Sequence, residues 1–302
     1  MKALQQLIYL GWWFIRARFF GRRKPLQSVL FVTNGCNSTC RHCTRCTLPT
    51  GHTFMPYDEI EKHLDYCYGQ GARMLDIEGV HLLRWHDGVH TAKDLFQLAK
   101  DKGFYSTSTM VPAADYAAWQ QLQVPVDVLW VSIMGFDDCT LLKNLQGASL
   151  YLVVNKTNYH ELPDVLEFVQ QHPDIWQIAF NFHTPFAGTE HLALSKEQRK
   201  EVINQLLDYK RQGHRIMNTV SGLKNMLTLQ FKRHCWICNF IYCDGRRSPQ
   251  CIDDVNSGLC EQCGFSMAGE MNAVFNLRPD TILTGLSIRK KITLATSRNE
   301  CV

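Results

Sequence analysis

The sequence has 302 residues, 45% of them hydrophobic, which is enough for one large domain with a full core and a small appendage. The formal net charge of +4 lies entirely in the first 24 residues: six of them are basic and none is acidic, which leaves 26 Lys and Arg against 28 Asp and Glu in the remainder. Because the main part of the chain has no basic surplus, the composition argues against a nucleic-acid partner.

Residues 1–24 predict a basic amphipathic helix. Apolar side chains recur at helical spacing, at Leu4, Ile8, Trp12, Ile15 and Phe19. The uncharged run among them is too short for the roughly 20 residues that a transmembrane helix needs. Two placements stay open: a peripheral contact with the inner face of the membrane, or packing across the bottom of the main domain.

From Leu26 onward, strand-like and helix-like stretches alternate, which predicts an α/β fold with a parallel sheet, either barrel-like or doubly wound. Chemistry in such folds gathers at the carboxyl ends of the strands. We expect strands at 27–33, 72–77, 104–109, 127–133, 149–155 and 175–182, and helices at 57–68, 91–102, 113–122, 137–145, 161–171 and 195–212.

The thirteen cysteines fall mainly in two clusters, which favours metal sites over a disulfide framework and indicates the reducing cytoplasm. In the first cluster, Cys36, Cys40 and Cys43 are spaced C-x3-C-x2-C directly after the first strand. Three thiolates hold three corners of a [4Fe-4S] cluster and leave one iron without a protein ligand. An alternative stays open, since Cys46 lies C-x2-C from Cys43 and would complete a four-thiolate set for zinc or a saturated cluster.

This spacing, with His42 just before the last cysteine, resembles the signature of the radical S-adenosylmethionine (radical SAM) family. The resemblance implies a partial (β/α)6 TIM-like barrel. It also implies that SAM binds the open iron, with His42 in the cofactor site, and is cleaved to a 5'-deoxyadenosyl radical, chemistry that belongs to the cofactor.

The resemblance also points to SAM-binding residues after later strands. Gly79 and His81 stand where the family has a Gly-Gly-Glu-Pro-like turn, and the missing acidic residue puts SAM affinity in doubt, since a charged acceptor for the SAM ammonium is lost. Ser132 and Asn155 are expected to touch SAM. His183, at the end of the sixth strand, is the expected catalytic residue as a proton donor or acceptor, with a plain pocket-wall histidine as the alternative.

The second cysteine cluster surrounds a turn at Asp244-Gly245 and resembles the SPASM or shorter twitch extension of radical SAM enzymes. The resemblance implies an auxiliary [4Fe-4S] cluster. Zinc is the alternative, because two C-x2-C pairs also match zinc-ribbon knuckles. The expected metal ligands are Cys235, Cys251, Cys260 and Cys263, with Cys238 as a rival ligand and Cys243 left over.

We therefore predict four parts: a basic N-terminal helix (1–24), the barrel (25–220), the cysteine-rich extension (221–270) and an amphipathic tail (271–302). The expected function is radical SAM chemistry on an unidentified small-molecule or lipid-like substrate, with a reductase, flavodoxin or ferredoxin as electron donor. Two alternatives stay open. One is a peptide-modifying maturase, and the other is a non-catalytic iron-sulfur electron carrier or scaffold with a degenerate SAM pocket.

Overall fold

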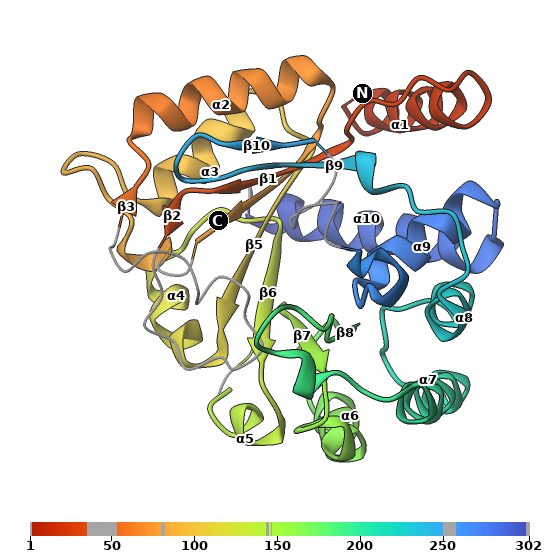
Figure 1. Cartoon of the computed structure of the whole chain (residues 1–302). Coiled ribbons are helices and arrows are strands. Elements are labelled where there is room, and N and C mark those ends of the chain that lie inside the picture. The colour runs from red at the N-terminus through yellow and green to blue at the C-terminus, as the bar shows by residue number, and fades with distance from the viewer. Residues whose placement is uncertain are drawn as a thin grey trace.

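The computed structural model describes residues 2–34, 53–79, 82–142, 145, 147–249 and 258–299. Its centre is an eight-stranded sheet in the order β10-β9-β1-β4-β5-β6-β7-β8, which curls into an open barrel (Figure 1). Neighbouring strands are parallel, except that β10 is antiparallel to β9. The strands are β1 (Gln27–Phe31), β4 (Met74–Glu78), β5 (Ser106–Pro112), β6 (Val128–Ile133), β7 (Ser149–Val154), β8 (Gln177–Phe182), β9 (Cys238–Ile241) and β10 (Arg247–Ser248).

The predicted alternation of strands and helices is confirmed. Strands β1, β4, β5, β6, β7 and β8 match the six expected strands, and the helices that follow them cover the outer face of the sheet (Figure 1). These helices are α2 (Tyr57–Gln70), α3 (Ala92–Asp101), α4 (Tyr116–Leu122), α5 (Phe136–Cys139), α6 (Leu162–Gln171) and α7 (Lys196–Arg211). The fold is the expected TIM-like α/β barrel with an N-terminal helix.

One predicted helix is shorter than expected. The sequence predicts a helix over 137–145, whereas α5 ends at Cys139. Beyond that residue the amides of Thr140, Leu141 and Leu142 each donate to the carbonyl three residues earlier, at 3.1 Å, so the chain tightens into turns. The Leu141 side chain is exposed, whereas Leu142 and Leu145 are buried in the main core, so this segment packs on the barrel without continuing the helix.

The two faces of the sheet have different surroundings. Alternate strand residues, among them Leu30, Leu75, Val131, Leu150 and Phe180, are completely buried and pack with the covering helices in one core. Successive side chains of a strand point to opposite faces, so the residues between them face the inside of the barrel. The interior is therefore lined by the other half of each strand.

The cysteine-rich segment is attached to both edges of this six-strand series. Strand β9 lies beside β1, and Ser28 Oγ donates to Asn239 Oδ1 at 2.5 Å. At the other edge, the Phe182 amide donates to the Gly264 carbonyl at 2.9 Å, and the Gly264 amide donates to Thr184 Oγ1 at 2.9 Å. One segment thus ties the first strand of the series to the last.

The attachment at Gly264 leaves no room for a side chain, since an added Cβ would lie 1.7 Å from the Phe182 carbonyl oxygen. We expect Gly264→Ala to release this segment from β8 and to lower the free energy of unfolding by about 2 kcal/mol or more, because backbone has to move. Urea denaturation followed by tryptophan fluorescence measures the change. Gly69→Ala is the matched control, because nothing lies within 4 Å of its added Cβ; equal stability of the two variants would contradict the contact.

Four further helices lie together beside the barrel: α1 (Lys2–Phe19), α8 (Val220–Thr228), α9 (Ser266–Phe275) and α10 (Pro279–Asn299) (Figure 1). None of the helices in the described part of the chain is both long enough and apolar enough to cross a membrane. Between α8 and α9 the buried Glu270 carboxylate accepts hydrogen bonds from the Thr219 amide at 2.8 Å and from Thr219 Oγ1 at 2.6 Å.

Glu270 makes stability depend on pH. Burial raises the pKa of Glu270 to about 7 from 4.5, so its contribution to stability is fully present below about pH 4.5 and is lost as the pH rises through about 7. Glu270→Gln keeps the neutral form, and we expect it to raise the free energy of unfolding at pH 8 by about 2 to 3 kcal/mol. Urea denaturation at pH 5 and pH 8 tests this, with Glu201→Gln as the control. An unchanged pH slope in Glu270→Gln would contradict it.

Candidate active site

The loop with the first three cysteines starts and ends at the carboxyl end of β1. Strand β2 (Thr33–Asn34) pairs with β3 (Thr53–Phe54), and Asn34 Oδ1 accepts a hydrogen bond from the Thr53 amide at 2.8 Å. The two ends of the segment 35–52 are therefore fixed side by side at the mouth of the barrel. Cys36, Cys40, His42 and Cys43, like Cys46, lie outside the described residues.

Gly79 lies against the base of this loop. An added Cβ would lie 2.5 Å from Thr33 Oγ1, and the Val32 amide donates to the Glu78 carbonyl at 2.9 Å, so the ends of β1 and β4 meet closely here. Thr33 Oγ1 is buried and has no hydrogen-bond partner among the described residues. A buried, unsatisfied hydroxyl next to a glycine suits a polar ligand at this end of β1. His81 lies outside the described residues.

The ends of β6 and β7 are held together by asparagines. Asn158 Nδ2 donates to the Met134 carbonyl at 2.9 Å and to the Val153 carbonyl at 3.0 Å. Asn155 is buried, and its Oδ1 accepts from the Thr157 amide at 2.8 Å and from Thr157 Oγ1 at 2.6 Å. Because these two hydrogen bonds occupy its oxygen, Asn155 already stabilises a turn. Its contact with SAM stays a prediction, as does that of the half-buried Ser132 on β6.

His183 follows β8 and is 4% exposed. Its Nε2 lies 3.0 Å from the Thr189 carbonyl oxygen and 3.1 Å from Thr189 Oγ1. Burial lowers the pKa of His183, which favours the neutral imidazole. The next loop therefore engages Nε2 of a neutral ring, and the catalytic role of His183 stays a prediction.

The inside of the barrel combines polar groups with aromatic rings. The Asp76 carboxylate on β4 accepts hydrogen bonds from Gln27 and Ser108 on the neighbouring strands, and burial raises the pKa of Asp76 to about 6. Further round, Trp130 and Tyr151 meet edge to face at 6.4 Å, and Tyr151 hydrogen-bonds Asn181. Such an interior can hold an organic substrate by aromatic contact and by a few directional hydrogen bonds.

In the extension, the side chains of Cys235, Cys238, Cys260 and Cys263 are half-buried, while Cys251 lies outside the described residues. Within the described ranges, the structure does not bring three or more metal-ligating side chains together. Burial raises the pKa of Cys263, an effect that the nearby guanidinium groups of Arg233 and Arg199 oppose. These cations would favour an anionic group at Cys263, and the auxiliary metal site stays a prediction.

Cys243 faces the first loop instead. It is buried at the end of β9, with Sγ 3.3 Å from the Thr53 carbonyl oxygen and 3.6 Å from that of Val32. Burial raises the pKa of the Cys243 thiol. The cysteine left over by the sequence pattern thus packs as a small buried residue under the base of the loop.

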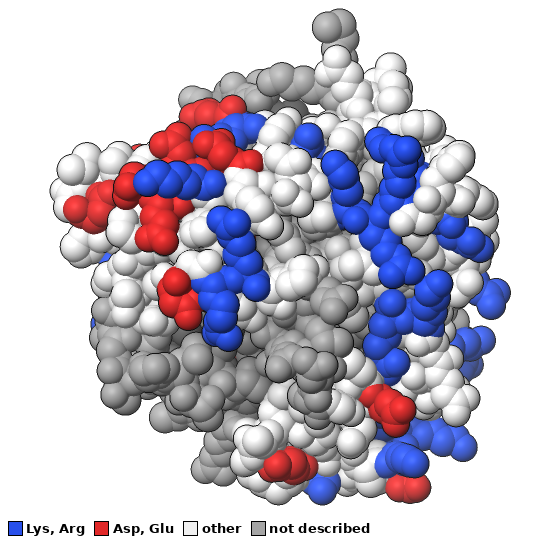
Figure 2. All heavy atoms as spheres, turned by 45° about the horizontal axis from the view of Figure 1, so that its top comes forward, with Lys and Arg blue, Asp and Glu red and all other residues white. Residues whose placement is uncertain are grey.

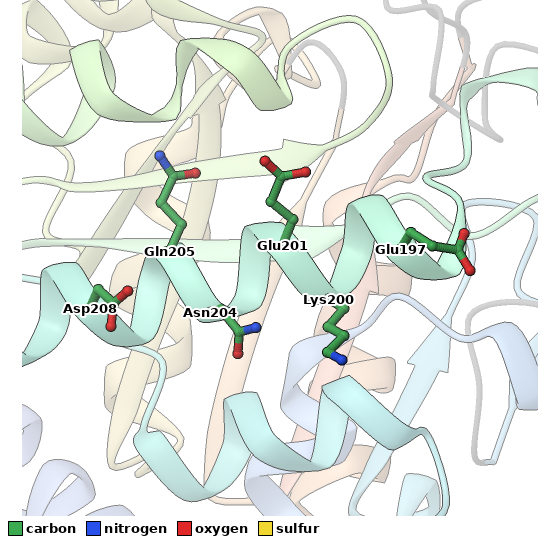
Figure 3. Close-up of a pocket in the computed structure, with 6 residues that line it drawn as sticks. All are labelled: Glu197, Lys200, Glu201, Asn204, Gln205 and Asp208. Carbon is green, nitrogen blue, oxygen red and sulfur yellow. The ribbon is translucent and has the colours of Figure 1, made fainter.

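A surface hollow lies elsewhere, on α7. Its six lining side chains all come from this one helix and fan out from it to different sides (Figure 3). They are Glu197, Lys200, Glu201, Asn204, Gln205 and Asp208. A polar face of a single helix gives no convergent set of groups, so we place the candidate active site at the barrel mouth and not here.

No protein-family model matches the sequence, and no curated protein matches it. Solved structures do match. Streptococcus suis SuiB bound to S-adenosylmethionine aligns with a TM-score of 0.57 at 11% identity, over 86% of this chain and 67% of that one. SuiB bound to the precursor peptide SuiA aligns with a TM-score of 0.56 at 11% identity, over 81% of this chain, which spans 64% of the SuiB chain.

A tagged form of anSMEcpe with bound AdoMet aligns with a TM-score of 0.52 at 12% identity, over 83% of this chain and 79% of that one. SuiB and anSME are radical SAM enzymes. The chain has the radical SAM fold. In this fold, the cysteine loop of the sequence stands after the first strand of the barrel, where β1 ends.

Several residues at the mouth of this radical SAM fold belong to no recognisable sequence motif. Thr33 and Asn158 are examples: the fold leaves the Thr33 hydroxyl buried at the end of β1 and lets the Asn158 amide join the ends of two strands. Asp76 and Ser108 lie on the adjacent strands β4 and β5. The alternation of side chains along each strand places both inside the barrel, but only the register of the two strands shows that they are neighbours.

Thr33 allows stability and SAM binding to be separated. Thr33→Val replaces the buried hydroxyl by a methyl group, and we expect a more stable protein without SAM, because an unpaired buried hydroxyl is lost. If that hydroxyl serves bound SAM, SAM affinity falls about 3- to 10-fold, the worth of one hydrogen bond. Thermal denaturation and equilibrium dialysis measure the two effects, with Thr33→Ser as the control. Unchanged SAM affinity in Thr33→Val would remove Thr33 from the site.

Proposed function

We propose that the protein is a radical SAM enzyme that reductively cleaves SAM at a [4Fe-4S] cluster and modifies a substrate held at the barrel mouth. The proposal rests on the agreement of two observations. The C-x3-C-x2-C loop is predicted from the sequence alone, and the chain around it has a radical SAM fold in which that loop follows β1. Neither observation depends on the other.

In this proposal Cys36, Cys40 and Cys43 hold the cluster and leave one iron to SAM. When bound, the cluster supplies the electron that turns SAM into methionine and a 5'-deoxyadenosyl radical. Gly79 lets the backbone approach the base of the loop, where Thr33 Oγ1 is unsatisfied among the described residues. His42, His81, Ser132 and Asn155 are the other proposed SAM contacts, and His183 is the proposed proton donor or acceptor.

We propose an auxiliary [4Fe-4S] cluster on Cys235, Cys251, Cys260 and Cys263, with Cys238 as a rival ligand and zinc as the competing metal. The electron donor would be a flavodoxin, a ferredoxin or a reductase. Since the cysteines are clustered in the sequence as for metal sites, we place the protein in the cytoplasm, where thiols stay reduced. Iron and zinc analysis of anaerobically purified protein distinguishes a second cluster from a zinc ion.

The proposed substrate is a lipid-like molecule, supported by the aromatic rings of Trp130 and Tyr151 inside the barrel. A peptide is the second candidate, because SuiB bound to the precursor peptide SuiA and anSMEcpe with a bound Kp18Cys peptide share the fold. Incubation of the reduced enzyme and SAM with host lipid and peptide extracts, analysed by mass spectrometry, separates the two. A change confined to the peptide fraction would contradict the lipid proposal.

Release of 5'-deoxyadenosine tests the chemistry itself. Anaerobically reconstituted, reduced protein is expected to form 5'-deoxyadenosine from SAM, and Cys36→Ala, Cys40→Ala or Cys43→Ala is expected to lower the rate at least 100-fold, because the cluster is lost. Cys46→Ala is the matched control and is expected to keep activity. An equal loss in Cys46→Ala would mean four protein ligands and no open iron. No product from fully reconstituted protein would favour the electron carrier or scaffold.

A further inference from the structure

Exposed apolar side chains are concentrated on one part of the molecule. Of the fifteen large apolar side chains that are exposed among the described residues, twelve lie on α1, on the residue after it, or on the α9–α10 segment. They are Leu4, Leu7, Ile8, Trp12, Ile15, Phe19, Phe20, Met267, Leu277, Ile282, Leu283 and Leu286. Only Val89, Leu122 and Leu141 lie elsewhere within the described ranges. A cluster of this kind marks an interaction surface rather than scattered exposure.

Helix α1 is firmly attached by its other side. Tyr9 Oη donates to the Gly71 carbonyl at 2.6 Å. The ring centroids of Trp13 and Trp236 are 5.8 Å apart, and those of Phe14 and Phe275 are 5.4 Å apart. The helix therefore buries one aromatic face against the barrel and leaves its second apolar face outside. The sequence left open whether this helix packs against the main domain or contacts the membrane. The two placements are compatible, because the helix has a separate apolar face for each.

Two hydrogen bonds join α1 to the α9–α10 segment, one near each end of α1. Near one end, Arg18 Nε donates to the Phe275 carbonyl at 2.8 Å, and near the other, Arg289 donates to the Gln6 side chain. The exposed Ile282, Leu283 and Leu286 lie in the sequence between these two points of attachment to α1. The apolar side chains of the two helices thus share one surface, which we call the α1–α10 surface.

The charges on the α1–α10 surface have one sign. Residues 4–24 and 266–290 contain eight Lys and Arg residues and two acidic residues. Both acidic residues have hydrogen-bond partners within the protein: Glu270 is 6% exposed, and the half-buried Asp280 accepts from the Ser221 amide and from Ser221 Oγ at 2.8 Å each. Lys and Arg side chains gather on the side of the molecule where α1 lies, while Asp and Glu gather over α2 (Figure 2).

We propose that the α1–α10 surface docks the protein on a bilayer of anionic phospholipid. Tryptophan and phenylalanine beside arginine suit the headgroup boundary, where apolar side chains enter and cations stay at the phosphates. Arg16 lies over the Trp12 ring at 5.8 Å and Arg18 over the Phe19 ring at 5.4 Å, so cation and ring already stand together. Each cation near an anionic surface adds to the attraction, and acidic groups are turned away.

The docked orientation follows from what α1 touches. Gly71 and Arg73 precede β4, and Tyr105 precedes β5; the Tyr9 ring lies under the Arg73 guanidinium at 4.9 Å and 5.6 Å from the Tyr105 ring. Helix α1 thus lies at the amino ends of β4 and β5, whereas the cysteine loop follows the carboxyl end of β1 (Figure 1). A docked molecule turns its barrel mouth away from the bilayer. This inference does not rest on the proposed function.

Flotation of the full-length chain with vesicles tests the proposal. We expect binding to vesicles of phosphatidylcholine with phosphatidylglycerol, and at least tenfold weaker binding to phosphatidylcholine alone. Ile8→Glu with Leu283→Glu is expected to reduce binding to the anionic vesicles at least tenfold. The matched control is Val89→Glu with Leu141→Glu, which adds the same charges at exposed apolar positions elsewhere and is expected to leave binding unchanged.

The cations have their own pair of variants. Arg22→Glu with Arg23→Glu is expected to weaken binding at least tenfold, and Lys156→Glu with Lys196→Glu is the control on exposed sites away from α1. Circular dichroism checks that each variant is folded. Failure of the wild-type chain to float, or equal losses in variants and controls, would overturn the proposal. The alternative is that this surface joins two copies of the chain. If light scattering shows a wild-type dimer that Ile8→Glu with Leu283→Glu dissociates, while flotation stays unchanged, the membrane proposal is also overturned.

Discussion

The parallel pairing of β1 with a strand on each side is the constraint on which the rest of the structure depends. Strand β4 fixes one edge of β1, and β9, from the far end of the chain, fixes the other. At its carboxyl end β1 leads into Asn34, whose side chain holds the returning segment at Thr53. A slip of one residue would turn Phe31 toward the helices and move the base of the cysteine loop, since side chains alternate between faces.

Much of the fold is predictable from the sequence because its signals are local. The alternation of apolar strands with amphipathic helices predicts all six strands of the series, and the spacing of Leu4, Ile8 and Trp12 predicts α1. Strand β9 was missed, because its four residues lie in a cysteine-rich segment that suggests a metal hairpin, and pairing with β1 is a contact over more than 200 positions. Helix α5 is shorter than predicted, because the chain after Cys139 continues in turns whose hydrogen bonds span three residues, which apolar spacing does not reveal.

The residues of the candidate site likewise fall into those that a local sequence pattern predicts and those that depend on the register of the strands. The cysteine spacing is a local pattern, so Cys36, Cys40 and Cys43 are predicted from the sequence. The unsatisfied hydroxyl of Thr33 and the amide of Asn158 that joins two strand ends depend on register, which no local pattern contains. For α1, composition suggested both packing and membrane contact, and only the structure shows that the aromatic residues divide between two faces of the helix.

The central claim is that the loop between Asn34 and Thr53 holds a cluster with one iron open to SAM. Electron paramagnetic resonance of the reduced, reconstituted protein before and after addition of SAM tests it most directly, because a ligand on the open iron changes the spectrum of that cluster. The account predicts a [4Fe-4S] signal that shifts on addition of SAM and that is absent from a chain lacking Cys36, Cys40 and Cys43. A spectrum that SAM leaves unchanged, or a loop that binds zinc and no iron, would contradict it.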